Sequence, residues 1–195
     1  MNNCIFTGHC INKICDQSCP DLVQANYLLE QSGISLNSSV FNTSSEQIAK
    51  YSKIILESEG KLVTVLDKNT NAAAELLTYC GICKYWKHSR LSTVVYNLKL
   101  SQYLDSIQNS WSGRVNSDEL EYKQIWSNSA KLLIISNIDY INFKDFQCRT
   151  LLSLLQARDK PDYTTIIVSP PINSLVGGEQ FFIKLQKVLS ETAIR

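Results

Sequence analysis

The chain has 195 residues, of which 44% are hydrophobic and 19% are charged. This length suits one domain, or one domain with a small appendage, and the composition excludes a disordered or fibrous chain. Nineteen Lys and Arg residues and 18 Asp and Glu residues give a net charge of +1. This near-neutral charge argues against a protein whose main function is to bind nucleic-acid phosphates. No apolar run approaches the roughly 18 residues of a membrane helix. The first ten residues lack the basic head and apolar centre of a secretory signal, so we expect a cytoplasmic protein with no membrane contact.

Four of the seven cysteines crowd into the first nineteen residues: Cys4, Cys10, Cys15 and Cys19. An odd number of cysteines without an export signal argues against a disulfide framework. Four soft ligands in a segment with little core of its own suit a structural Zn²⁺, whose binding would supply folding free energy. The spacing lacks paired C-x2-C knuckles, so free cysteines and an iron–sulfur cluster stay as alternatives, and His9 could replace one cysteine.

Helical and strand patterns alternate along the rest of the chain. Ser44 and Gln47 form a capping-box pattern at the start of a helix that Gly60 ends. The predicted helices cover 21–33, 44–60, 72–86, 101–111, 118–128, 143–159 and 178–194. The predicted strands are the apolar runs 62–66, 92–98, 131–136 and 164–169. This alternation predicts a three-layer α/β domain with a parallel sheet over 41–195, preceded by a cysteine-rich zinc-binding segment and short helix over 1–40.

A second cysteine pattern, Cys80-Gly81-Ile82-Cys83, matches the C-x-x-C of redox sites. Redox motifs of this kind sit at a helix start after a strand, whereas this one lies inside a predicted helix. We therefore interpret both cysteines as core packing, with a redox or metal role as the alternative.

The order of the elements resembles the ATPase core of bacterial and phage replicative-helicase loaders, the DnaC/DnaI type of AAA+ protein. The strand, loop and helix over 62–86 are followed by an LLIIS-x-ID strand and a TTIIVS strand, as in this family. The N-terminal Cys15-Asp16-Gln17-Ser18-Cys19 and the following YLLEQSGI also resemble the family's cysteine-rich segment and helix. The resemblance covers roughly residues 4–170 and implies an AAA+/P-loop-like core.

The phosphate loop that the resemblance implies is degenerate. The family has a glycine-rich turn that ends in Gly-Lys-Thr or Gly-Lys-Ser, whose backbone N–H groups, Lys and hydroxyl hold phosphate and Mg²⁺. The corresponding stretch lacks glycine, and its last two residues fall where Lys and Thr should be. It consists of Asp67, Lys68, Asn69, Thr70, Asn71, Ala72, Ala73 and Ala74.

Three other catalytic parts of the family also depart from its pattern. The third strand should end in two acidic residues, but here it ends Ser136-Asn137 and Asp139 comes two positions too late. Ser169-Pro170 replaces the Thr-Asn or Ser-Asn of the fourth strand. The fifth strand and the trans-acting arginine region look absent, and Arg195 is a poor candidate for that arginine. Because phosphoryl transfer depends on these parts together, we expect no catalytic residues and no functional ATP or Mg²⁺.

The densest basic cluster contains Lys84, Lys87 and Arg90, beside Tyr85 and Trp86. Cations interleaved with aromatic rings suit weak contact with single-stranded DNA, as the resemblance also implies. A solvated helix end with a buried Trp is the alternative.

These features together predict a protein-interaction factor rather than an enzyme. The resemblance implies a phage- or mobile-element-encoded pseudo-ATPase of replication that binds a replicative helicase, to load it or to block it. The zinc-bound segment would dock the helicase, and the core would be a scaffold that could form oligomers. The alternative is an adaptor or inhibitor that binds another nucleoprotein complex.

Overall fold

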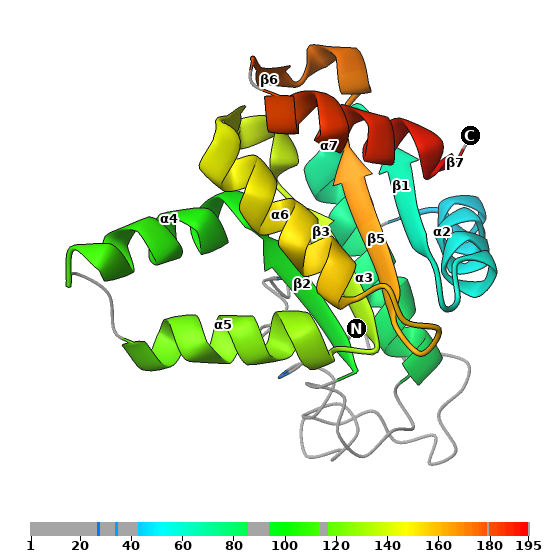
Figure 1. The fold of residues 1–195 in the computed structure, drawn as a ribbon. Helices are drawn as coiled ribbons and strands as arrows, with labels where there is room; N and C mark the ends of the chain where they lie inside the picture. Colours follow the sequence, from blue (N-terminus) through cyan, green and yellow to red (C-terminus); the bar gives the residue numbers. More distant parts are fainter. Residues whose placement is uncertain are drawn as a thin grey trace.

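The computed structural model describes residues 43–85, 94–113, 117–178 and 180–194, together with Tyr27 and Ile34. Five parallel strands form one sheet in the order β2-β3-β5-β1-β7 (Figure 1). The strands are β1 (Leu62–Leu66), β2 (Val95–Lys99), β3 (Leu132–Ser136), β5 (Thr164–Ser169) and β7 (Ala193–Ile194). The predicted α/β class with a parallel sheet is therefore confirmed.

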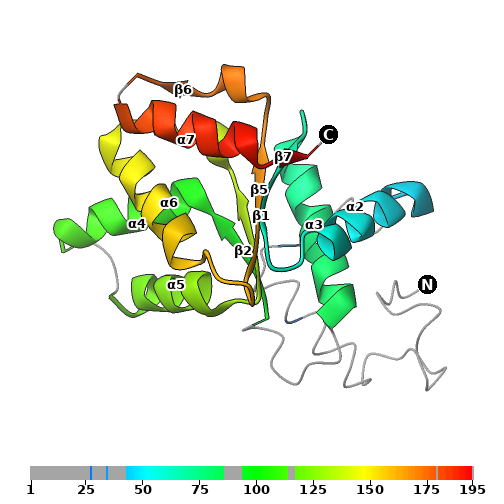
Figure 2. The ribbon, with the colours of Figure 1, turned by 45° about the vertical axis from the view of Figure 1, so that its right-hand side comes forward.

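Six helices of the described residues surround this sheet. They are α2 (Ser45–Glu57), α3 (Thr70–Tyr85), α4 (Leu100–Trp111), α5 (Ser117–Ser129), α6 (Asp145–Ala157) and α7 (Gln180–Glu191). Helices α2 and α3 cover one face, and α4 to α7 cover the other (Figure 2). For α3 to α7 this division follows from the right-handed crossover rule, because the chain steps in one direction from β1 to β2 and in the opposite direction at each later crossover.

Alternation along the strands builds a core on each face of the sheet. On β5, Ile166 and Val168 pack toward α2 and α3, whereas Ile167 packs toward the other helices. All three side chains are fully buried, as expected for a parallel strand covered on both faces. Ile34, from the segment predicted to bind zinc, is also fully buried and belongs to the core beside α2 and α3.

The prediction that the fifth strand of the sheet is absent is wrong. Ala193 and Ile194 form β7, which pairs in parallel with Thr64 and Val65 of β1. The hydroxyls of Thr64 and Thr192 lie 2.8 Å apart and reinforce this junction. The strand was missed because two residues after a helix carry no detectable alternation of their own.

Local signals place the helix starts well. Ser44 accepts a hydrogen bond at its Oγ from the backbone N–H of Gln47, at 3.3 Å, as the capping pattern predicts. Helix α3 begins at Thr70, two residues before the predicted start. No helix in the described part of the chain is long and apolar enough to cross a membrane.

Candidate functional site

The carboxyl ends of β1 and β5 lie side by side at a switch in chain direction. Helix α3 leaves β1 toward one face, and the path from β5 leads through α7 to the opposite face. Open α/β sheets bind ligands in the crevice that such a switch creates. Residues 67–74, which the resemblance marks as a degenerate phosphate loop, lie here, so this edge is the candidate functional site.

The loop from β1 to α3 contains only three residues, Asp67, Lys68 and Asn69. Hydrogen bonds fix its backbone at both ends. The N–H of Asp67 donates to the carbonyl of Ser169 at 3.0 Å, and the N–H of Asn69 donates to Asp67 Oδ1 at 2.8 Å. A three-residue connection fixed in this way is too short to wrap around a phosphate group.

The first turn of α3 is capped by the chain itself. The Asn69 Oδ1 atom accepts a hydrogen bond from the N–H of Ala72 at 3.1 Å, the usual bond of an N-cap residue. Ala73 and Ala74, which stand where the family has Lys and Thr, are 1% and 2% exposed and pack in the core. The side chains at these two positions therefore do not reach the crevice.

Thr70 joins the start of α3 to the segment after β3. Its hydroxyl donates to Asp139 Oδ2 at 3.0 Å, although the two residues are 69 positions apart. Asp139 lies in the short 3-10 helix η3 (Ile138–Tyr140), which follows Asn137 in the left-handed region at φ 59°. Asn137 thus turns the chain so that Asp139, two positions further on, comes beside Thr70 at the start of α3.

Tyr51 brings α2 into the same site. Its phenol O–H donates to Asp67 Oδ2 at 2.8 Å, so Asp67 accepts one bond from α2 and one from its own loop. Burial, followed by the bond to Asp67, raises the pKa of Tyr51 far above its ordinary value. Tyr51 therefore stays neutral at ordinary pH and keeps the proton that it donates to Asp67. No local sequence signal points to this contact, because it joins residues 16 positions apart.

The ends of β3 and β5 supply hydroxyls that are also engaged. Ser136 Oγ donates to Asn97 Oδ1 of β2 at 2.8 Å, within the buried sheet. Ser169 Oγ donates to the carbonyl of Pro170 at 2.8 Å. Both hydroxyls are therefore engaged with neighbouring groups, and Pro170, which follows Ser169, has no side-chain amide.

The chemistry available at this edge is limited. Asp67 and Asp139 place two carboxylates beside the N-terminus of α3, where the partial positive charge of the helix would otherwise favour an anion. The described residues contain no group of three His, Cys, Asp or Glu side chains placed to hold a metal ion. Both histidines, His9 and His88, lie outside the described residues. The loop from β1 to α3 also carries one cation, Lys68, whose side chain is exposed.

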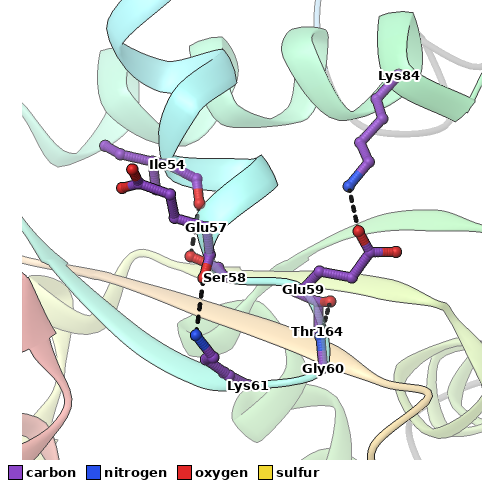
Figure 3. A network of polar contacts seen from close by, with 8 residues as sticks. All are labelled: Ile54, Glu57, Ser58, Glu59, Gly60, Lys61, Lys84 and Thr164. Carbon is purple, nitrogen blue, oxygen red and sulfur yellow. Dashed lines mark hydrogen bonds and ion pairs between the residues drawn. The ribbon is translucent and has the colours of Figure 1, made fainter.

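Lys84, from the predicted nucleic-acid cluster, lies at the opposite end of the strands from this site. Lys84, near the end of α3, forms a 3.1 Å ion pair with Glu59, in the turn that leads into β1 (Figure 3). Its side chain is only 21% exposed and lies 5.1 Å from the ring centroid of Tyr85. Lys87 and Arg90 lie outside the described residues, as do the predicted zinc ligands Cys4, Cys10, Cys15 and Cys19.

Of the C-x-x-C pattern, Cys80 packs in the core as predicted, whereas Cys83 is only partly buried. Cys80 is 3% exposed, and a Cβ on Gly81 would lie 2.6 Å from Leu132 Cδ2, so glycine lets α3 approach β3 closely. Burial raises the pKa of both thiols, that of Cys83 to about 11. Neither thiol is a thiolate at neutral pH, which opposes a redox role.

The raised pKa of Cys83 predicts a loss of stability at alkaline pH. The folded state favours the neutral Cys83 thiol. The stability that goes with this is fully present below pH 9, the ordinary thiol pKa, and is lost as the pH rises toward about 11. Between pH 8 and 10.5 we expect the free energy of unfolding to fall by about 2 kcal/mol through this group. Urea unfolding of the wild type and Cys83→Ala at both pH values measures the difference. An equal fall in both proteins would contradict it.

Comparisons with known proteins identify no relative. No family model, no curated protein and no solved structure matches this chain. The case for a function therefore rests on the geometry described above and on the resemblance of the sequence motifs.

Proposed function

We propose that this chain works by binding another protein, without nucleotide, as a non-hydrolysing counterpart of the replicative-helicase loaders. The observation that carries the proposal is the self-capped start of α3. Asn69 caps its N-terminus, and Asp67 and Asp139 stand beside it. A protein of loader type that had lost nucleotide would keep its fold as a scaffold for contacts.

The free-energy cost of displacing the Asn69 cap opposes the binding of ATP at this edge of the sheet. A phosphate at the start of α3 would have to displace the Asn69 cap, whose loss alone costs about 1 kcal/mol. It would also approach the carboxylates of Asp67 and Asp139, with the exposed Lys68 as the one cation of the three-residue loop, because Ala73 and Ala74 are buried in the core. Catalysis of phosphoryl transfer depends on positioning and charge neutralisation by several groups together, and the loop offers one cation for this.

Two further points support the link to the loaders. The switch point between β1 and β5 carries the degenerate loop, at the place where sheets of this kind bind their ligands. The short fifth strand, β7, restores an element that the family has. By analogy with the family, the segment 1–40 with Cys4, Cys10, Cys15 and Cys19 would hold Zn²⁺ and dock the replicative helicase.

The nucleotide half of the proposal predicts that the full chain does not bind Mg²⁺-ATP. We expect no saturable heat in isothermal titration up to millimolar ATP, and no phosphate release above the level without protein. Asp139→Ala serves as the matched variant, since it removes one carboxylate of the site. Hydrolysis that the wild type supports and Asp139→Ala abolishes would show an active site and overturn this half.

The partner half is tested by affinity capture from host lysate without added nucleotide, with mass spectrometry of the retained proteins. A Cys15→Ser, Cys19→Ser variant runs beside the wild type as the control for the N-terminal segment. Recovery of the replicative helicase by the wild type and its loss with the variant are the expected results. Recovery of a different complex instead would favour an adaptor or inhibitor that kept the scaffold and changed its partner.

A further inference from the structure

A cavity of about 670 Å³ lies at the end of the sheet opposite the candidate site, where β1 and β5 begin. The first residues of both strands line it, together with the second halves of α6 and α7 and the loop from α6 to β5. A cavity of this volume is within the usual range for sites that bind small organic molecules. None of its lining residues belongs to the candidate site.

Arg158 is a buried cation in the wall of this cavity, with 2% of its surface exposed. Its Nε, Nη1 and Nη2 atoms each donate one hydrogen bond, to Thr165 Oγ1 and to the carbonyl oxygens of Ser127 and Thr164 respectively. Because a guanidinium has five N–H donors, one N–H on each terminal nitrogen has no acceptor among the described residues. Two donors in one plane match the two oxygens of a carboxylate.

The positive charge of Arg158 also lacks a counter-ion. Burial lowers the pKa of Arg158 to about 10, so the guanidinium remains charged at neutral pH. No carboxylate in the described part of the chain forms an ion pair with it. The guanidinium carbon lies 4.9 Å from the ring centroid of Tyr163, a neutral partner. Since a buried charge without an opposite charge is costly, an anion that entered the cavity would be stabilised.

The other charged residues of the cavity give it an excess of positive charge. Lys61 and Lys160 line it and are exposed, and Asp159 contributes one carboxylate. With Arg158, three cations and one anion leave an excess of two positive charges. Lys61 Nζ donates to the backbone carbonyl of Glu57 at 3.2 Å, and this acceptor is neutral (Figure 3). The cavity therefore attracts anions.

Aliphatic side chains supply a second type of surface in the same cavity. Leu62 of β1, Leu152 of α6 and Val188 of α7 line it, and all three are only partly buried against the core. A hydrocarbon chain that covered them would remove apolar surface from water. A ligand that suits this cavity therefore has an anionic group and an apolar body.

We infer that the cavity binds an organic carboxylate with an aliphatic body. The carboxylate meets the two spare N–H groups of Arg158, and Lys61 and Lys160 add to the attraction. The hydrocarbon lies against the aliphatic side chains of β1, α6 and α7. This site is independent of the proposed function, because a chain that captured no helicase would still carry it.

The test is isothermal titration of sodium octanoate into the full chain at 50 mM salt, with saturable binding at one site as the expected result. Octylammonium has the hydrocarbon with the wrong charge, whereas acetate and inorganic phosphate have the charge without the hydrocarbon. Each should bind at least about tenfold more weakly than octanoate. Absence of saturable octanoate binding overturns the inference, as does equal binding of any of the other three ions.

Two substitutions alter the cavity and leave Arg158 in place, because Arg158 also supports the fold. Gln156→Glu adds a carboxylate to the exposed part of the wall. It should weaken octanoate binding about fivefold, the effect of a like charge about 4 Å away in water. Val188→Trp fills the cavity with a larger side chain and should abolish saturable binding.

Two control variants make the same changes outside the cavity. Gln108→Glu alters an exposed residue of α4, and Ile183→Trp alters a residue of α7 that is 68% exposed. Both should bind octanoate like the wild type, and circular dichroism should show that all four variants fold. Cavity variants that bind octanoate as tightly as these controls would place the ligand elsewhere and overturn the inference.

Discussion

Gly60→Ala should destabilise the protein by about 3 kcal/mol, one of the largest effects expected of any single methyl group here. Gly60 lies in the turn before β1 at φ +69°, a conformation that costs an L-residue about 1–2 kcal/mol. An added Cβ would also lie 2.5 Å from the backbone carbonyl oxygen of Pro161. Backbone cannot move aside as a flexible side chain can, so the clash adds to the strain. Urea unfolding, monitored by circular dichroism, measures the difference.

Gly113→Ala is a matched control for this substitution. Gly113 has nearly the same backbone conformation, φ +67°, but an added Cβ would meet no atom within 4 Å. Its destabilisation should therefore be limited to the strain of about 1–2 kcal/mol. If both variants lose the same stability, the contact with Pro161 contributes nothing and the turn can open without cost. Such a result would also question the bond from the Gly60 N–H to Thr164 Oγ1 (Figure 3).

Arg158→Met should destabilise the protein by about 3–4 kcal/mol, although it removes a buried charge. Arg158 is 2% exposed and donates three hydrogen bonds of 2.9–3.0 Å, which are shared among α5 and β5. The acceptors are Thr165 Oγ1 and the carbonyl oxygens of Ser127 and Thr164. Methionine fills similar space but leaves these acceptors unsatisfied, which costs about 1–3 kcal/mol for each buried group.

The competing effect is the cost of burying the guanidinium. Burial lowers the pKa of Arg158 to about 10, and among the described residues no carboxylate forms an ion pair with it. Replacing buried charges with apolar side chains is sometimes neutral. Urea unfolding of Arg158→Met and of Arg149→Met, the same change at an exposed site, decides which effect dominates. Equal stability of the two variants would mean that desolvation offsets all three hydrogen bonds.

The repeating parts of the fold could be predicted from the sequence because they depend on local patterns. The run 164–169 is predicted with the bounds that β5 has, since five of its six residues are β-branched and all six are buried, as is typical of a parallel strand. The helix start at Ser44 is predicted because capping uses residues three positions apart. Core placement of Cys80 follows from its position within an apolar helix.

The contacts that define the candidate site could not be predicted, because they join residues distant in the chain. The bonds of Asp139 to Thr70 and of Asp67 to Tyr51 depend on the sheet order and on the left-handed turn at Asn137. Arg158 is similarly hidden, because a basic residue at the end of a helix usually faces water. Only the folded chain shows that its side chain turns inward to meet β5.

The pairing of β1 has a consequence for how the protein folds as it is synthesised. Strand β1 pairs with β5 and β7, which are the last two strands of the sheet to be synthesised. Leu62 pairs with Thr165, so its partner is synthesised roughly a hundred residues later. Until then both edges of an apolar strand are open to other chains, a state prone to aggregation. Pairings so distant in sequence also slow folding. Stalled synthesis before β5 should therefore leave a nascent chain that depends on chaperones, even though β2 and β3 are already complete.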